Sequence, residues 1–251
     1  MTPTKDWYED DAFWTDFYDI LFSPARFTQA RELLAESPLL RFAPGSRVLD
    51  LCCGAGVFTA PLARLGHRVT GVDRSAVLLE RAARACAEAG TKARLVEADV
   101  LEYAEPDSFD VALSLFTSFG YFPEPADNLR VLRTLHDSLV PGGQLVLDVA
   151  GKEILARKVL TPKVIERGED ELLVQTDTAL DAWTRLRSDW VLVRGDRVRR
   201  ERLEWFVYSA AELRAMAVQA GFDAVEVFGG FDGRPYDEHA DRLLLRAVRE
   251  R

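Results

Sequence analysis

The stretch Val48-Leu49-Asp50-Leu51-Cys52-Cys53-Gly54-Ala55-Gly56-Val57-Phe58-Thr59 decides the fold. An apolar run ends in an acid and meets a glycine turn, after which Leu62 and Leu65 begin an amphipathic helical pattern. This order predicts a buried parallel strand followed by a turn that opens a helix. Gly54 and Gly56 let the backbone approach a ligand that a Cβ atom would push away.

The residues around this turn indicate which nucleoside it binds. A nicotinamide-binding loop has the pattern G-x-G-x-x-G, but Thr59 stands at the third glycine position. Asp50 precedes the glycines instead, and a buried carboxylate suits a ligand with a cationic amino acid end. S-adenosylmethionine has such an end. A nicotinamide-dependent oxidoreductase is the alternative, because it shares the glycine turn and the downstream acid Asp73.

Further strands follow, and two of them lead to acids. Residues 68 to 73 form a short apolar run that ends at Asp73, placed to reach ribose hydroxyls. Residues 93 to 97 predict a third strand that leads to Asp99, which could accept a hydrogen bond from an adenine amino group. Val100 and Leu101 would flank that ring. Residues 108 to 115 and 144 to 149 read as the fourth and fifth strands, the latter after a Pro-Gly-Gly turn.

Together these motifs resemble the class I S-adenosylmethionine-dependent methyltransferases of the small-molecule type. The resemblance covers residues 40 to 150 and comprises, in order, D-L-C-C-G-A-G at 50–56, G-V-D at 71–73, A-D-V at 98–100, S-F-D-V-A at 108–112 and L-V-P-G-G at 139–143. It implies S-adenosylmethionine as cofactor and S-adenosylhomocysteine as product. The three histidines and three cysteines form no set with metal-ligand spacing, so we expect no metal. The cofactor-binding residues that we predict are Asp50, Cys52, Gly54, Gly56, Asp73, Arg74, Asp99, Val100, Leu101, Leu115 and Phe116.

One position departs from the family pattern. Cys52 stands where the family usually has glycine, so we expect its backbone to avoid positive φ. A third functional reading follows from this departure. In that reading the chain is a non-catalytic S-adenosylmethionine-binding module, because Cys52 has displaced the geometry that methyl transfer needs.

The second half of the chain changes pattern after Val149. Residues 172–176, 184–193 and 197–208 read as strands without intervening helices, and a capping box at 209–212 then opens a last helix before two closing strands. We predict an α/β fold: a doubly wound, Rossmann-like, seven-stranded sheet with an inserted antiparallel β-sheet before the last helix and hairpin. The predicted units are an aromatic helical cap (1–40), the cofactor-binding core (41–151), the inserted sheet (152–207) and the completing helix and strands (208–251).

Composition limits the partners. The 251 residues and 48% hydrophobic content suit one α/β domain, and the net charge of −9 disfavours a general nucleic-acid binder. No apolar run is long enough to cross a membrane and no signal peptide is recognisable, so we expect a cytoplasmic protein. The inserted sheet covers the acceptor or forms a homodimer. The sequence leaves this choice open.

The residues that carry the chemistry are harder to name, because methyl transfer is an in-line displacement that needs mainly orientation. Tyr121, after the fourth strand, and His239 are weak catalytic candidates. Two N-terminal aromatics, Tyr8 and Trp14, either cover the cofactor or pack as an ordinary helix. The predicted acceptor-lining residues are Tyr121, Arg187, Trp190, Trp205 and Tyr236. The expected function is methyl transfer to a nitrogen or oxygen of a small molecule.

Overall fold

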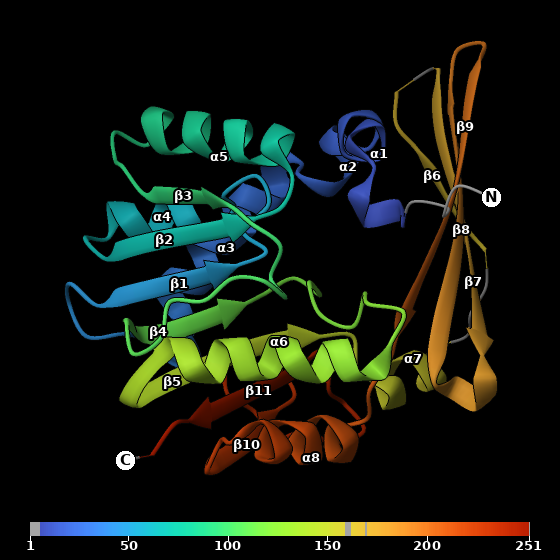
Figure 1. Cartoon of the computed structure of the whole chain (residues 1–251). Helices are drawn as coiled ribbons and strands as arrows, with labels where there is room; N and C mark the ends of the chain where they lie inside the picture. Colours follow the sequence, from blue (N-terminus) through green and yellow to red (C-terminus); the bar gives the residue numbers. More distant parts are fainter. Residues whose placement is uncertain (1–5, 159–161, 169, 251) are drawn as a thin grey trace.

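The computed structural model describes residues 6–158, 162–168 and 170–250. Its main sheet, sheet A, has seven strands in the order β3-β2-β1-β4-β5-β11-β10 (Figure 1). The five strands on the β3 side are parallel, and β11 is antiparallel to both of its neighbours. The strands are β1 (Arg47–Leu51), β2 (Arg68–Asp73), β3 (Arg94–Glu97), β4 (Phe109–Ser114), β5 (Leu139–Val149), β10 (Ala224–Phe228) and β11 (Leu243–Val248). The predicted doubly wound sheet is confirmed.

Helices cover both faces of sheet A, as its apolar strands require. Strand β1 shows how the two faces are divided. Val48 packs with Leu34 and Leu62 in one buried cluster, whereas Leu49 packs with Leu132 in the other. The helices that flank the sheet are α3 (Pro24–Glu36), α4 (Thr59–Arg64), α5 (Ala76–Glu88), α6 (Pro125–Ser138) and α8 (Ala210–Ala220).

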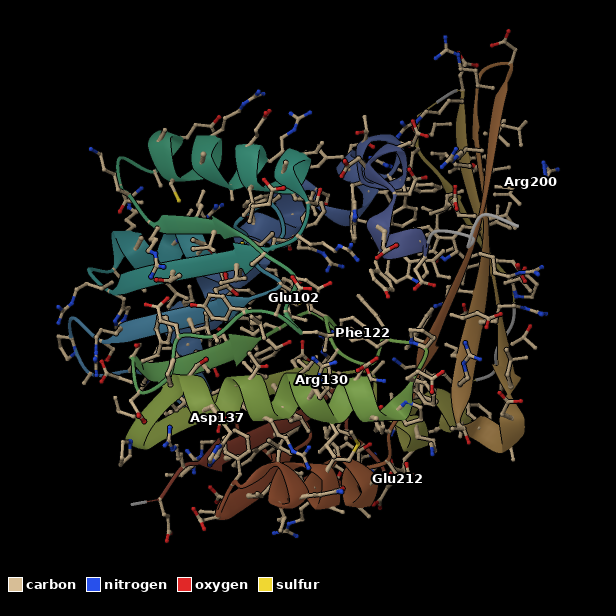
Figure 2. All side chains as sticks on the ribbon, in the orientation of Figure 1. Glu102, Phe122, Arg130, Asp137, Arg200 and Glu212 are labelled. Carbon is tan, nitrogen blue, oxygen red and sulfur yellow. The ribbon has the colours of Figure 1, made fainter. Side chains whose placement is uncertain are left out.

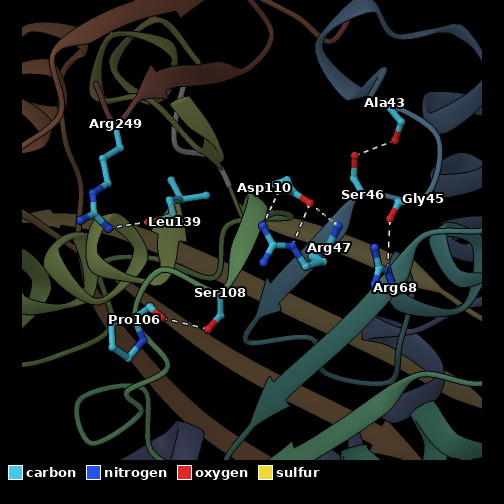
Figure 3. A network of polar contacts seen from close by, with 10 residues as sticks. All are labelled: Ala43, Gly45, Ser46, Arg47, Arg68, Pro106, Ser108, Asp110, Leu139 and Arg249. Carbon is cyan, nitrogen blue, oxygen red and sulfur yellow. Dashed lines mark hydrogen bonds and ion pairs between the residues drawn. The ribbon is translucent and has the colours of Figure 1, made fainter. Parts of the chain in front are cut away.

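Polar contacts hold the amino ends of the strands (Figure 3). The Arg47 guanidinium lies 2.7 Å from the Asp110 carboxylate, and the Arg47 backbone N–H donates to the same group at 2.8 Å. Arg249 donates to the carbonyl of Leu139. These contacts join β1 to β4 and the C-terminal segment to β5, so the opposite end of the sheet is left for the loops that bind ligands.

The insert forms a second sheet, sheet B, in the order β6-β7-β8-β9. It is antiparallel, as predicted, and Gly195 adopts the positive φ of 58° that the tight β8–β9 turn requires. Its elements are α7 (Lys152–Arg157), β6 (Lys163–Glu166), β7 (Glu171–Leu180), η3 (Asp181–Trp183), β8 (Arg185–Arg194) and β9 (Arg197–Phe206). Helix α7 and strand β6 were not predicted.

An aromatic segment at the N-terminal end of the described chain docks on sheet B (Figure 1). This segment comprises η1 (Trp7–Glu9), α1 (Asp11–Asp16) and α2 (Tyr18–Leu21), and η2 (Pro38–Leu40) follows α3 before sheet A begins. Phe13 and Phe17 are fully buried against Leu173, Leu192 and Leu203 of the insert. The aromatic segment and sheet B therefore share one small apolar core. None of the helices described here is long and apolar enough to cross a membrane.

Candidate active site

A pocket opens at the carboxyl ends of the parallel strands, between sheet A and the aromatic segment. Its floor comes from the β1 glycine turn, the β2 end, the residues after β3 and the loop after β4. Phe122, labelled in Figure 2, projects between this edge and sheet B. The lining residues that carry the argument are Tyr8, Trp14, Phe22, Arg26, Asp50, Cys52, Gly54, Phe58, Asp73, Arg74, Asp99, Val100, Leu115, Phe116 and Tyr121.

Asp50 is the acid at the end of β1, and it is 4% exposed. The Thr59 hydroxyl donates to its carboxylate at 2.5 Å. Burial raises the pKa of Asp50 to about 6, a shift that the Thr59 hydrogen bond opposes and the charge of Asp73 increases. Among the described residues no cationic side chain forms an ion pair with Asp50. The site therefore offers a buried carboxylate that a ligand ammonium group would stabilise.

Asp73 ends β2 and holds the turn around it. One carboxylate oxygen accepts from the Gly54 N–H at 2.8 Å and the other from the Ser75 N–H at 3.0 Å. Burial raises the pKa of Asp73, and these backbone hydrogen bonds oppose that shift. Asp99 accepts from the Leu101 N–H at 2.8 Å and is only half-buried. The three acids thus lie along one edge of the sheet, in the strand order β1, β2, β3.

The Cys52 expectation was wrong. Cys52 has a φ of 60°, so it adopts the left-handed conformation that glycine normally supplies. Gly54 is also left-handed, and a Cβ added there would lie 3.0 Å from the ring of Phe22. The sequence argument failed because it treated a preference of glycine as a prohibition for cysteine.

The aromatic segment closes one side of the pocket, where Tyr8 and Trp14 line it. The Trp14 indole N–H donates to the Tyr8 carbonyl at 2.9 Å. The Arg74 guanidinium pairs with Glu9 and lies 5.6 Å from the centre of the Tyr8 ring. The Ser75 hydroxyl donates to the Asp11 carboxylate at 3.0 Å. These contacts tie the segment to the turn that follows Asp73.

The loop after β4 carries a strained backbone. Phe116 and Thr117 have φ values of 57° and 65°, a conformation that costs non-glycine residues about 1 to 2 kcal/mol each. Asp148, which is fully buried on β5, holds them: its carboxylate accepts from the Phe116 N–H at 2.9 Å, and its carbonyl accepts from the Thr117 N–H at 3.0 Å. Arg242 donates to the same carboxylate at 2.8 Å. The loop presents the Phe116 ring to the pocket.

The predicted site residues divide into two groups. Of the predicted cofactor residues, Gly56 and Leu101 do not line the pocket, and the others do. A Cβ at Gly56 would lie 3.0 Å from the Ala82 backbone, so glycine at this position allows helix α5 to pack closely against the turn. Tyr121 lines the pocket between the aromatic segment and the loop, with its ring 4.8 Å from that of Trp7.

The other predicted acceptor residues lie elsewhere. Trp190 packs on Phe17 with ring centres 5.4 Å apart, Arg187 pairs with Asp189, and Trp205 packs on the shared core of sheet B. The Tyr236 hydroxyl donates to Glu153, and the His239 side chain is 83% exposed. None of these five side chains is among the residues that line the described pocket, so their role toward an acceptor stays a prediction. Alternation along a strand did not indicate how far sheet B lies from the strand ends of sheet A.

Several pocket residues escaped sequence reasoning. Phe22, Arg26 and Phe58 all line the pocket. Phe58 follows the glycine turn directly, and its ring lies 4.9 Å from that of Phe116, so its place beside the motif was a usable signal. Phe22 and Arg26 reach the pocket only because α3 folds back over the turn. No motif marks them.

Comparisons with known proteins agree with this geometry. A protein-family model described as a methyltransferase domain matches residues 48–143. The cypemycin N-terminal methyltransferase of a Streptomyces species is 31% identical over 217 residues, which cover 82% of this chain and 84% of that protein. The chain belongs to the class I S-adenosylmethionine-dependent methyltransferases. As a methyltransferase it is an enzyme, which decides against the oxidoreductase and the non-catalytic module.

One further sequence relative and one solved structure are also similar to this methyltransferase. The ubiquinone biosynthesis O-methyltransferase of Xanthomonas campestris pv. campestris strain B100 is 31% identical over 156 residues, which span 57% of this chain and 62% of that protein. The structure of the CcbJ methyltransferase from Streptomyces caelestis matches with a TM-score of 0.79, covering 98% of this chain and 99% of that one. At 19% identity, that match shows the shared fold.

Proposed function

We propose that this methyltransferase transfers the methyl group of S-adenosylmethionine to a nitrogen or oxygen atom of a small molecule, and that an amine nitrogen is the preferred acceptor. The observation that carries the proposal is the pocket itself. It combines three acids along the strand ends with an aromatic wall from the aromatic segment and the β4 loop. A sulfonium donor and an apolar acceptor both suit such a lining.

The residues fit the cofactor on structural grounds. Asp50 is a buried carboxylate without a cationic partner among the described residues, and it would hold the methionine ammonium group. Asp73 would accept from the ribose hydroxyls, and Asp99 with Val100 would contact the adenine. The bound cofactor supplies an electrophilic methyl group. The residues of the chain orient the two reactants and exclude water.

The preference for nitrogen rests on the groups that the pocket lacks. None of its described lining residues is a histidine or a lysine, and the proposal assigns the three lining carboxylates, Asp50, Asp73 and Asp99, to the cofactor. Burial raises the pKa of the Tyr121 hydroxyl and of the Cys52 thiol, so both are neutral and poor bases near pH 7. A neutral amine attacks without losing a proton first, whereas an alcohol needs a base. A relative that matches 82% of the chain carries the name cypemycin N-terminal methyltransferase.

Methyl incorporation from labelled S-adenosylmethionine tests the proposal. The purified protein is incubated with panels of matched amines and phenols, and the products are identified by mass spectrometry. We expect methylated amines together with S-adenosylhomocysteine, and weaker transfer by a Tyr121→Ala variant, which removes one aromatic ring of the pocket wall. Transfer to phenols alone would contradict the preference for nitrogen. A lack of transfer to any acceptor in either panel would contradict the proposed function.

A further inference from the structure

Asn128 is a fully buried polar side chain to which the proposed function gives no role. It is the fourth residue of α6 and shares the buried face of that helix with Val131, Leu132 and Leu135. These three neighbours belong to the main apolar core, and the spacing of the face suits apolar residues. Burying an amide costs free energy unless the amide is hydrogen-bonded, so packing alone does not explain an asparagine at this position.

The side-chain amide of Asn128 holds the loop after β4. Its Nδ2 group donates to the Phe122 carbonyl at 3.1 Å, six residues earlier in the chain. Among the described residues, no group donates to the Asn128 Oδ1 atom, which is buried. The one side-chain hydrogen bond that these residues give Asn128 therefore runs to the loop. Helix α6 has no side-chain cap at Glu124, so this bond joins the helix to the loop at that end.

The same loop has a second anchor on the other side of Tyr121. The Gly120 carbonyl accepts from the Phe206 N–H at 2.8 Å, at the end of β9. Gly120 has a φ of 99°, and a Cβ there would lie 2.6 Å from the Phe206 carbonyl oxygen, so glycine allows this close approach. Tyr121 thus stands between an anchor on sheet B and an anchor on α6.

The anchored rings of Tyr121 and Phe122 form a wall that faces the aromatic segment. The Tyr121 ring is nearly parallel to the Tyr8 ring, with an interplanar angle of 19° and centres 6.2 Å apart. The Phe122 ring meets Tyr8 edge-on, with centres 5.8 Å apart. All three rings line the pocket, and the proposed function assigns the strand-end acids to the cofactor. The rings therefore belong to the part of the lining that is left for the acceptor.

We propose that Asn128 is a positioning residue of the acceptor site, which fixes the wall of Tyr121 and Phe122 through the Phe122 carbonyl. The proposal rests on the proposed function, because that function makes this wall the acceptor side. Asn128 is not among the described lining residues, so it acts through the loop. Supporting hydrogen bonds of this kind keep a site in its productive geometry, and a misplacement of about 1 Å can cost a large factor in rate.

Fluorine nuclear magnetic resonance reports on the wall directly. The protein is labelled with 3-fluorotyrosine, and a Tyr121→Phe variant identifies the Tyr121 signal. In Asn128→Ala we expect this signal to shift and broaden, because the loop loses one anchor, while the signals of Tyr18 and Tyr236 stay unchanged. Asn128→Gln keeps an amide donor and should restore part of the wild-type spectrum. Leu135→Ala is the matched control, because it truncates another buried side chain of α6, two turns further on, and leaves both loop anchors in place.

Kinetics show whether the wall serves the acceptor. The acceptor is benzylamine or whichever amine of the panel reacts fastest, and cofactor binding is measured by calorimetry with S-adenosylhomocysteine. We expect Asn128→Ala to raise the KM of the amine by about 2- to 10-fold, the range of one neutral hydrogen bond, and to leave the affinity for S-adenosylhomocysteine unchanged. Asn128→Gln should recover part of this loss. Leu135→Ala should leave both quantities unchanged.

An Asn128→Ala variant with the wild-type KM for the amine would overturn the role of Asn128, whether or not the Tyr121 signal moves. An equal loss of affinity for the amine and for S-adenosylhomocysteine would also overturn it, since that marks a structural residue. Failure of the wild type to methylate any amine is a different result, because it contradicts the proposed function itself. The fluorine spectra then still show whether Asn128 holds the loop.

Discussion

Two residues of the β1 turn determine what the pocket can hold. Asp50 is a carboxylate that the fold buries without a cationic partner among the residues described, and Cys52 accepts a backbone conformation usually left to glycine. Both are costly in isolation, and such costs concentrate at functional sites. The sequence identified Asp50 from its place before the glycines. It misjudged Cys52 because backbone dihedrals follow from the whole turn.

The affinity for S-adenosylhomocysteine should depend on pH through Asp50. Its pKa is raised to about 6, and only the ionised form attracts the ligand ammonium group. As the pH increases toward 6, the affinity should increase by up to about tenfold per pH unit, and above pH 7 it should become constant. In the unliganded protein the same shift acts in the opposite sense, so the contribution of Asp50 to stability falls as the pH rises from about 4 to 6.

Calorimetry between pH 5 and pH 8 measures this dependence. Methylthioadenosine is the control ligand, because it lacks the ammonium group and reports any effect of the buried Asp73. Asp50→Asn should bind S-adenosylhomocysteine weakly at every pH. A pH profile that is the same for the wild type and the variant would show that Asp50 is not the titrating group.

Substitutions of Cys52 should separate backbone strain from side-chain size. Cys52→Val places a β-branched residue at a φ of 60°, which is disfavoured more strongly than cysteine there, and we expect it to lower the free energy of unfolding relative to the wild type. Cys52→Gly suits the conformation and should cost less. Urea unfolding of both variants gives the comparison. Equal stability of the valine variant and the wild type would argue against the left-handed turn.

At the scale of elements, the loop after β4 and the aromatic segment complete the pocket. Strand β4 was predicted closely from its apolar run, and the place of its loop followed from the topology. The contacts that hold the loop were not predictable. Asp148 and Arg242 meet only when β5 and β11 pair, and strand pairing between distant segments leaves no local pattern.

The apolar core that the aromatic segment shares with sheet B should unfold separately from the core of sheet A. Phe17→Ala removes a fully buried ring, and such truncations typically cost about 3 to 5 kcal/mol. We expect hydrogen exchange to accelerate in residues 7–22 and in β7 to β9, and less in sheet A. Val164→Thr is the control, since Val164 lies on the same sheet but is 61% exposed. Uniform acceleration over both sheets would contradict a separate core.

At the scale of the whole molecule, the sequence predicted the architecture well and the acceptor side poorly. The strand ends bring Asp50, Asp73 and Asp99 to one edge because parallel strands share a direction, and that rule needs no tertiary detail. Trp190 and Arg187 illustrate the opposite case. The placement of Trp190 depends on how sheet B packs against the aromatic segment. Arg26 likewise reaches the pocket only through tertiary packing, because no local pattern places α3 beside the strand ends.

The most direct test of the central claim is calorimetry of the wild type and Asp73→Ala with S-adenosylmethionine. The account predicts micromolar binding by the wild type, and a loss of about 1 to 3 kcal/mol in the variant, the scale of charge-assisted hydrogen bonds to ribose hydroxyls. Absence of binding by the folded wild type, or equal affinity in the two proteins, would contradict the cofactor site described at this edge of sheet A.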